Sequence, residues 1–309
     1  VTLVQNGSDK IGGSAVNAVL STEGLAVTLV YVDATQGWLV TDSGLQSEAP
    51  LPQYICASVS GACNTLVTVD TNYKLATFVG PGTFTVNSVG NPSGSTSVCA
   101  AIVAGGGGAG SLYGGGGGGG GLVLDSDGFT VSATGYPIVI GSGGAGPTGN
   151  SLPGTSGSNS TGLGYVTIGG GQGGGGGGGG GAEAGGSGGG GGGCNTGPNT
   201  GTQPSQPNTG ATNYGNPGGP GIRGGGGGGA GGAGSSGPGG AAGAGLDVSP
   251  TVGPAPSIPN SGVYSAGGAG QAGGTIGAAN TGNGGGGDCY SCGRGAGGSG
   301  IVIIRYKFQ

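Results

Sequence analysis

The chain has 309 residues, of which 94 are Gly, with only 6% charged residues, no His and a formal net charge of −5. So few bulky side chains exclude a conventional side-chain core for most of its length. The absence of His removes Ser-His-Asp and Cys-His catalysis, and the six basic residues are scattered along the sequence without forming a patch, which argues against nucleic-acid binding: Lys10, Lys74, Arg223, Arg294, Arg305 and Lys307.

Residues 1–45 alternate β-branched and polar side chains and are predicted to form a β-rich fibre or attachment region. Within it, residues 27–32 and 37–40 are expected to pair as a hairpin. Residues 46–76 contain Pro50 and Pro52 and are predicted to be a connecting segment. No charged segment followed by an apolar run opens the sequence, and no 18 apolar residues occur together, so we expect neither a signal peptide nor membrane insertion.

From residue 77 to residue 309 glycine runs alternate with short apolar pieces, and this part is predicted to be one glycine-rich domain with exposed loops. The pieces are rich in β-branched and aromatic residues, which favour β-strands. We therefore expect strands in seven places: residues 83–86, 97–103, 121–124, 129–131, 136–140, 165–168 and 300–306.

The glycine runs themselves need a structural explanation. A flexible linker would not be interrupted by apolar strands that need partners, and collagen requires Gly at every third position rather than at all three. The remaining interpretation is a bundle of packed polyglycine II helices, extended chains with three residues per turn whose N–H and C=O groups bond to neighbouring chains. Gly114–Gly121 would be an interior helix, and the nine glycines of residues 173–181 would span about 28 Å.

Glycine offers no side-chain burial to offset the entropy of ordering its backbone. The fold class predicted is therefore mainly β with polyglycine II and little or no α-helix, in which short strands align the glycine helices. We call the apolar strand residues that would align the glycine helices the scaffold. They are Phe84, Val86, Val98, Ile102, Val123, Phe129, Val131, Ile138, Ile140, Val166, Ile168, Val302 and Ile304.

The order FTV, SVCAAIVAGGGG, PIVIGSGGAG, YVTIGGGQGGGG and a terminal GGSGIVIIRY resembles the glycine-rich domain of tail-fibre and other virion proteins of tailed bacteriophages. The resemblance covers about residues 76–309. It implies a non-enzymatic tail-fibre tip adhesin on the virion, in which loops on a polyglycine II core bind a host outer-membrane protein or surface glycan. It also implies other virion fibre subunits as partners, and a homotrimer. The alternatives are a purely structural virion protein, as a fibre shaft or capsid decoration, and a cellular surface appendage protein.

Receptor contacts are expected in loops between the glycine runs, because the runs carry little chemical variety. Tyrosine gives a large contact area at low entropic cost, so the candidate receptor-binding residues are taken from the loops at 195–222, 246–264 and 278–294. These tyrosines could equally cover the edges of the glycine bundle. The candidates are Asn213, Tyr214, Tyr264 and Tyr290.

Other motifs point to chemistry less clearly. A G-x-G-x-x-G match after residue 104 lacks a following helix, so no cofactor is predicted, and Asp125-Ser126-Asp127-Gly128 starts like a calcium loop but is better explained as a turn. No metal site is predicted. Among six cysteines, two pairs lie close in sequence and either form local disulfides or remain free thiols, Cys56 with Cys63 and Cys289 with Cys292.

Overall fold

The structure is a computed structural model, and it falls into two compact units, Val1–Pro52 and Gln53–Gln309, which are described separately. The residues that it describes are 1–45, 52–177, 180–193, 199–206, 210–254, 257–290 and 295–309.

The first unit is built around the expected hairpin. Strand β3 (Leu25–Asp33) pairs antiparallel with β4 (Gly37–Leu45), and a smaller ladder joins β1 (Thr2–Leu3) to β2 (Ala18–Val19). The carboxylate of Asp33 accepts the N–H groups of Thr35 and Gln36, both at 2.7 Å, which closes the hairpin turn. Among residues 1–44 only Gly37 is buried, so this unit has no side-chain core of its own.

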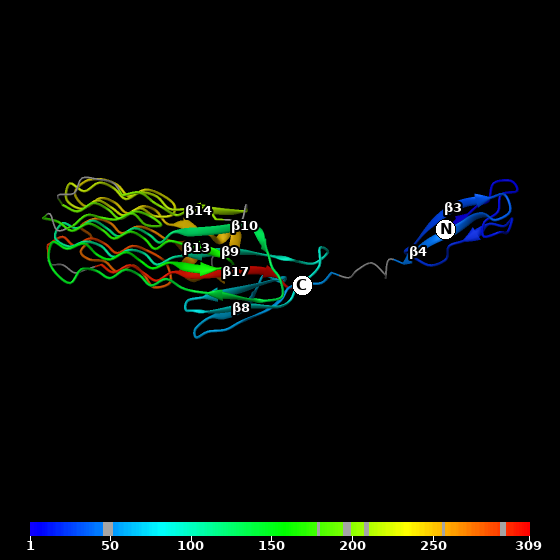
Figure 1. Cartoon of the computed structure of the whole chain (residues 1–309), viewed down its shortest axis with the longest axis horizontal. Helices are drawn as coiled ribbons and strands as arrows, with labels where there is room; N and C mark the ends of the chain where they lie inside the picture. Colours follow the sequence, from blue (N-terminus) through cyan, green and yellow to red (C-terminus); the bar gives the residue numbers. More distant parts are fainter. Residues whose placement is uncertain (46–51, 178–179, 194–198, 207–209, 255–256, 291–294) are drawn as a thin grey trace. The chain divides into compact units, whose positions relative to one another are not determined.

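The second unit contains two antiparallel sheets, and Figure 1 labels several of their strands. The larger sheet has the order β14-β10-β9-β17-β7-β6, and the smaller has the order β11-β8-β5. The strands of the larger sheet are β6 (Thr65–Val69), β7 (Tyr73–Phe78), β9 (Ser97–Val103), β10 (Leu122–Thr130), β14 (Ala211–Tyr214) and β17 (Ile301–Lys307). Those of the smaller sheet are β5 (Cys56–Val59), β8 (Gly82–Ser88) and β11 (Gly135–Ile138).

Two hydrophobic clusters lie on the opposite faces of the larger sheet. One fills the space against the smaller sheet and includes Phe84, Ile102 and Val302. The other includes Ile301 and Ile303, and is covered by the segment that follows residue 245. Successive residues of β17 therefore enter different clusters, which explains why this strand is a continuous apolar run rather than an alternating one.

The covering segment and the remaining ladders are short. They comprise β12 (Ser160–Gly162), β13 (Tyr165–Thr167), β15 (Leu246–Asp247), α1 (Ser249–Val252), a 3-10 turn η3 (Pro259–Gly262) and β16 (Val263–Tyr264). The expectation of a mainly β fold with little helix is thus confirmed, because α1 is a single turn in the part of the chain that the structure describes.

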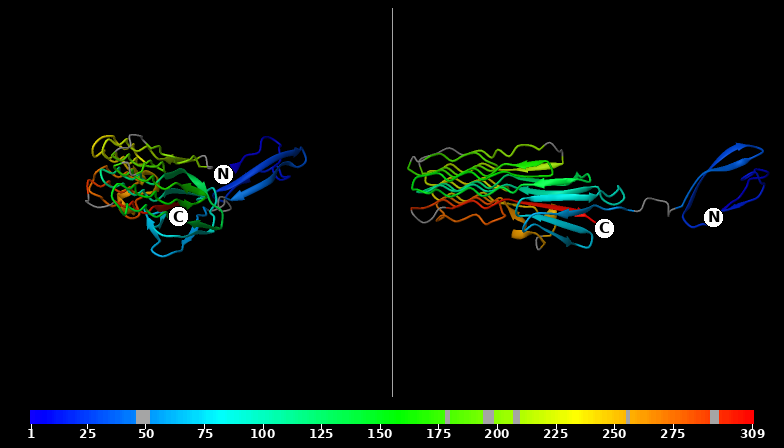
Figure 2. Two further views of the ribbon diagram at one scale, coloured as in Figure 1. Left: turned by 60° about the vertical axis from the view of Figure 1, so that its left-hand side comes forward. Right: turned by 60° about the horizontal axis from the view of Figure 1, so that its bottom comes forward.

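Glycine runs continue from the strand ends and lie side by side, as the views in Figures 1 and 2 agree. We call this bundle the glycine lattice; its principal runs are residues 104–110, 114–121, 168–176, 185–193, 224–230, 265–270 and 283–287. The run 104–110 leaves β9, and the run 114–121 returns to β10, so the turn between them lies at the end of the lattice away from the sheets. We call the turns at that end the far turns.

The N–H groups of residues 114–121 follow a period of three. Residues 115, 118 and 121 donate to the carbonyls of residues 174, 171 and 168, residues 116 and 119 to those of 225 and 228, and residues 114, 117 and 120 to those of 288, 285 and 282. The distances lie between 2.8 and 3.1 Å. A period of three is the one expected of an extended chain with three residues per turn.

The carbonyl groups of the same run accept from three further neighbours, again in threes. Residues 115, 118 and 121 accept from residues 110, 107 and 104, residues 116 and 119 from 190 and 187, and residue 117 from 268. All eight glycines are buried, in agreement with the interior position expected for this run. A Cβ added to Gly117 would lie 2.0 Å from the carbonyl oxygen of Gly107, so no side chain fits there.

The nine-glycine run 173–181 does not cross the lattice as expected. Residues 173–176 are buried, but the chain then turns, with φ of 63° at Gly177 and 115° at Gly180, and Gly175 donates back to the carbonyl of Gly180. Positive φ is accessible to glycine without steric cost, so the longest run serves partly as a turn.

Two further expectations differ from the structure. Residues 46–76 were expected to connect two regions, yet 56–59, 65–69 and most of β7 are strands of the second unit, and 46–51 lie outside the described residues. In the scaffold, Val166 is 41% exposed, because alternation along β13 turns Tyr165 and Thr167 inward instead. Most of the other scaffold residues are buried or pack against the first cluster.

Candidate functional site

The far turns bring together aromatic and cationic side chains from three distant parts of the sequence. The rings of Tyr113 and Tyr290 lie 6.2 Å apart with 50° between their planes, and the guanidinium of Arg223 lies 5.7 Å from the centre of the Tyr113 ring. The side-chain amide of Gln271 donates to the backbone carbonyl of Arg223. We call Tyr113, Arg223, Gln271 and Tyr290 the far-turn cluster.

Local backbone geometry presents these side chains to solvent. Leu112 and Tyr113 have φ of 54° and 57°, so the chain reverses sharply between two buried runs and leaves the Tyr113 ring outside. The exposed fractions are 38% for Tyr113 and 67% for Tyr290. Near Tyr290 the backbone carbonyl of Asp288 accepts from Gly114, so the turn is tied to the interior run. Aromatic side chains with exposed rings beside a cation suit recognition of sugars or protein surfaces.

Of the four candidate receptor-binding residues, only Tyr290 belongs to this cluster. Tyr264 is fully buried in the second hydrophobic cluster and its hydroxyl donates to the carbonyl of Pro259 at 2.5 Å, so its assignment as a receptor contact is wrong. Its strand β16 pairs with β15, which places the ring under the covering segment. Burial raises the pKa of the Tyr264 hydroxyl well above its ordinary value.

Asn213 and Tyr214 lie at the other end of the unit from Tyr290. Both are in β14, the edge strand that pairs with β10, and each is half-buried. Tyr214 packs against the second hydrophobic cluster, which agrees with the alternative that these tyrosines cover an edge. The structure therefore does not assemble the four candidates into one site.

Tyr113 and Arg223 were missed by sequence reasoning. Tyr113 stands between two long glycine stretches and belongs to none of the loops considered, and Arg223 follows directly after the loop 195–222. The signal that could have found them is that a bulky residue in an otherwise uninterrupted glycine segment marks a turn, because it cannot enter the lattice.

The structure describes three of the four cysteines in the two close pairs. Cys56 and Cys63 are both free and exposed, and Cys289 is free, so a bridge between Cys56 and Cys63 is not formed in this structure. Cys63 lies in a turn with φ of 62°, before β6. Cys292 lies outside the described residues.

The calcium-like segment is an irregularity within β10. The β9–β10 register shifts between Asp125 and Phe129, and the carboxylate of Asp125 accepts from the Gly128 N–H at 2.9 Å and from the Tyr165 hydroxyl. Asp125 is buried, so its oxygens accept hydrogen bonds inside the fold. Within the described ranges no group of three or more His, Cys, Asp or Glu could hold a metal ion, and no helix is long and apolar enough to cross a membrane.

The strands of this chain continue into hydrogen-bonded glycine runs, and the runs end in turns with exposed side chains. This arrangement defines a glycine-rich β-protein. The chain belongs to the glycine-rich domain family, whose model matches residues 79–307. No curated protein matches the sequence.

Proposed function

We propose that this chain is a non-enzymatic tail-fibre tip protein of a tailed bacteriophage that binds a host outer-membrane protein or surface glycan. The observation that carries the proposal is the far-turn cluster, because it places exposed Tyr113, Tyr290 and Arg223 at the end of a hydrogen-bonded lattice. The resemblance to glycine-rich domains of phage virion proteins supplies the biological setting, the surface of the virion.

The lattice suits this role because its interior lacks variable side chains. We propose that its runs are polyglycine II helices, on the strength of the three-residue period and the six hydrogen-bonded neighbours of residues 114–121. Such a bundle fixes the ends of each turn, while the turn residues are free to change. Rigid support of a binding loop lowers the entropic cost of binding.

The chemistry of the cluster favours a glycan or an aromatic-rich protein surface. The two tyrosine rings offer apolar faces and hydroxyl groups, and Arg223 adds a charged donor that remains beside a ring rather than in an ion pair in the part of the chain described. We therefore replace Tyr264 by Tyr113 and Arg223 in the proposed receptor contacts, and keep Tyr290.

Binding of labelled full-length chain to a panel of Gram-negative cells and their outer-membrane extracts tests the proposal. We expect saturable binding to at least one strain, and a loss of about tenfold or more for the double variant Tyr113→Ala/Tyr290→Ala, since aromatic anchors carry much of an interface's energy. The control is Val166→Ala, which trims a residue at the sheet end that is 41% exposed, close to the 38% of Tyr113. Equal binding by all three proteins would contradict the role of the far turns.

The first unit is proposed to join this chain to further copies, as a homotrimer, or to other fibre subunits. Its hairpin exposes Val30, Tyr31, Val32, Trp38 and Val40, and none of its described side chains is buried. Two isolated ladders of this kind are marginally stable in water, so association would supply the missing core. Analytical ultracentrifugation should show trimers for the full chain and a shift to monomer for Trp38→Ser/Val40→Ser; a monomeric parent chain would contradict it.

A purely structural virion protein remains the second candidate, because the lattice alone could build a shaft or a capsid decoration. Gold-labelled antibody to the chain on intact particles separates the two roles. Label at the distal tips of fibres supports adhesion, whereas label along a shaft or over the capsid supports a structural role. Label on cells without particles would instead favour a cellular appendage.

A further inference from the structure

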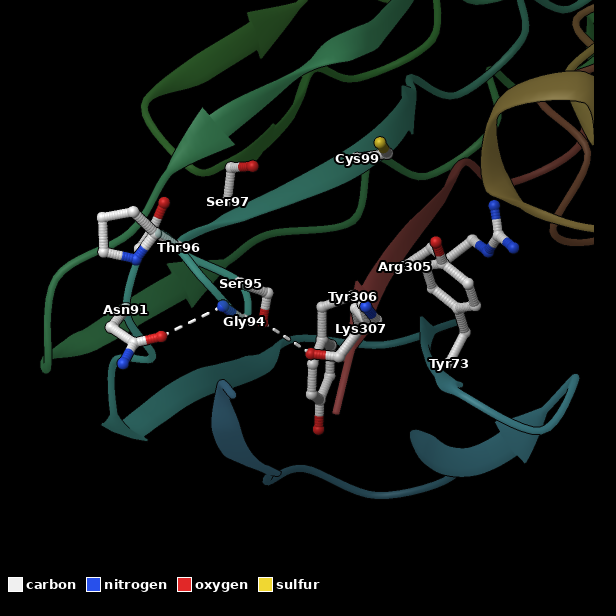
Figure 3. A pocket seen from close by; sticks show the side chains of 11 residues that line it. Tyr73, Asn91, Gly94, Ser95, Thr96, Ser97, Cys99, Arg305, Tyr306 and Lys307 are labelled. Carbon is white, nitrogen blue, oxygen red and sulfur yellow. Dashed lines mark hydrogen bonds between the residues drawn. The ribbon is translucent and has the colours of Figure 1, made fainter. Parts of the chain in front are cut away.

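A pocket of about 370 Å³ lies on the larger sheet at the end away from the glycine lattice (Figure 3). It lies on the sheet face that carries the second hydrophobic cluster, beyond the part that α1 covers. Its walls come from the end of β17, the start of β7 and β9, and the connection between β8 and β9. The residues that matter here are Tyr73, Asn91, Thr96, Ser97, Arg305 and Lys307.

Two of the six basic residues, Arg305 and Lys307, line this pocket. Lys74 lies on the neighbouring strand, because β17 pairs with β7, with Lys307 opposite Tyr73 and Tyr306 opposite Lys74. Arg305 and Lys307 are two residues apart on one strand, so both face the pocket, while Lys74 faces the other way. Figure 3 shows Arg305 beside the Tyr73 ring.

Arg305 is held in a fixed orientation with part of its donor capacity unused. Its guanidinium stacks 3.8 Å from the centre of the Tyr73 ring, and one terminal nitrogen donates to the carboxylate of Asp70 at 3.3 Å. The Nε atom is buried and has no hydrogen-bond partner among the described residues. That atom lies beside Gly253 and is closed to a ligand, so it is the terminal nitrogens of the guanidinium that can reach an oxygen in the pocket.

Lys307 supplies a second positive charge at the same wall. Its ammonium lies 5.1 Å from the centre of the Tyr54 ring, and it forms no ion pair with any residue that the structure describes. Asp70 offsets only one of the two charges, and its side chain is 49% exposed. Burial raises the pKa of the Cys99 thiol, which lines the pocket; Asp125 and Asp127 raise it further, and Arg305 lowers it.

From these contacts we infer that the pocket binds a carboxylate-bearing sugar, with the carboxylate held by the guanidinium of Arg305 and the ammonium of Lys307. A planar carboxylate fits the guanidinium better than other anions of similar size, since its two oxygens match the fork of N–H donors. Thr96 and Ser97 place hydroxyl groups on the facing wall, where they suit the hydroxyls of a sugar ring. The volume lies in the range of small-ligand sites.

This site is separate from the far turns, since it lies at the opposite end of the unit. The inference therefore does not rest on the proposed function, and either can fail without the other. Residues of the far-turn cluster do not line the pocket.

Isothermal titration calorimetry of the full chain with sodium glucuronate, glucose and sodium acetate tests the inference. We expect saturable binding of glucuronate, and binding at least about tenfold weaker for glucose, which lacks the carboxylate, and for acetate, which lacks the ring hydroxyls. No binding of glucuronate, or equal binding of glucose, would overturn the site. Equal binding of acetate would show that a free carboxylate is the ligand, and would overturn the sugar assignment.

Variants of the pocket residues then test where glucuronate binds. Arg305→Lys keeps a charge but removes the planar guanidinium, and Lys307→Gln removes the second charge; each should weaken glucuronate binding about tenfold or more. Lys74→Gln is the matched control, because it changes a basic residue of the same strand pair on the opposite sheet face. Unchanged binding in both pocket variants, or an equal loss with Lys74→Gln, would overturn the inference.

Discussion

The sheets and the glycine lattice of the second unit are held together in opposite ways. In the sheets, buried side chains such as Phe84, Ile102 and Val302 fill the space between layers. In the lattice, the backbone of residues 114–121 bonds to six neighbouring runs, and a Cβ on any of residues 114–120 would lie within 2.5 Å of a backbone oxygen. The comparison teaches that one chain can contain a core in which side chains are required and a core in which they are forbidden.

The two regions also depend on each other. A glycine run gains only about 0.5–1.5 kcal/mol from each hydrogen bond, while ordering each residue costs about 1–2 kcal/mol. Runs that enter and leave through strands of the sheet have their ends fixed by apolar packing, as 104–110 and 114–121 do between β9 and β10. The sheet therefore provides the stability that lets the lattice form.

The largest expected effect lies in the sheet region. Phe84→Ala should lower the free energy of unfolding by about 3–5 kcal/mol, because the ring is fully buried in the first cluster against Tyr306, at 5.8 Å between ring centres. Equilibrium denaturation monitored by circular dichroism measures it. Val166→Ala, at an exposed position of β13, is the control and should change stability by less than about 0.5 kcal/mol. Similar losses in both variants would contradict a side-chain core in the sheets.

In the lattice, adding a side chain is expected to lower the free energy of unfolding, whereas in the sheets removing one does so. Gly117→Ala adds a methyl group 2.0 Å from the Gly107 oxygen and should cost about 1–3 kcal/mol or more, although Ala favours ordered backbone elsewhere. The control Ala233→Ser lies at an exposed position at the edge and should be nearly neutral. Denaturation under the same conditions compares them, and a neutral Gly117→Ala would mean that the run is not an interior one.

Alkaline pH should lower stability through the sheet region, which contains a buried tyrosine, because the glycines of the lattice have no ionisable side chain. Burial raises the pKa of Tyr306, in the sheet, to about 12. An unfolded tyrosine ionises near pH 10, so between about pH 10 and 12 the unfolded state loses protons that the folded state keeps, and stability falls as pH rises. Denaturation at stepped pH should show a shallower fall for Tyr306→Phe. An identical pH dependence would exclude Tyr306 as a contributor.

The smallest effect on stability is expected at the far turns. Tyr113→Ala/Tyr290→Ala removes exposed rings and should change the free energy of unfolding by less than about 1 kcal/mol, while it reduces binding to cells. Thermal unfolding measured beside the binding assay gives both values. A loss of stability as large as that of Phe84→Ala would show that the rings support the lattice rather than recognition.

Much of the sheet could be predicted because apolar, β-branched runs mark strands directly. The segments around Ile102, Val123 and Ile304 are strands as expected. Strands β5–β7 were missed because prolines and turn residues around them favoured a connection, and β14 was missed because ATNY carries little apolar character. Their pairing depends on β8, β17 and β10, which are distant in sequence.

The interior position of one glycine run could be predicted, but the path of another could not. Residues 114–121 are interior as expected, whereas residues 173–181 turn at Gly177, and a uniform run contains no signal for where it turns. The candidate site could likewise be predicted only where it does not depend on which segments are neighbours. The exposure of Tyr290 agrees with the sequence, but the burial of Tyr264 depends on the β15–β16 ladder, and the approach of Arg223 to Tyr113 depends on which runs are neighbours.

The three-residue period also constrains how this chain can change in length. The N–H groups of residues 115, 118 and 121 donate to one neighbouring run, and those of residues 116 and 119 to another. Deleting one glycine would therefore rotate every later N–H of that run by a third of a turn, toward the wrong neighbour. Deleting three would shorten the run by one turn and restore every partner. Insertions and deletions within an interior run should therefore be tolerated in multiples of three, while the far turns can vary by any number.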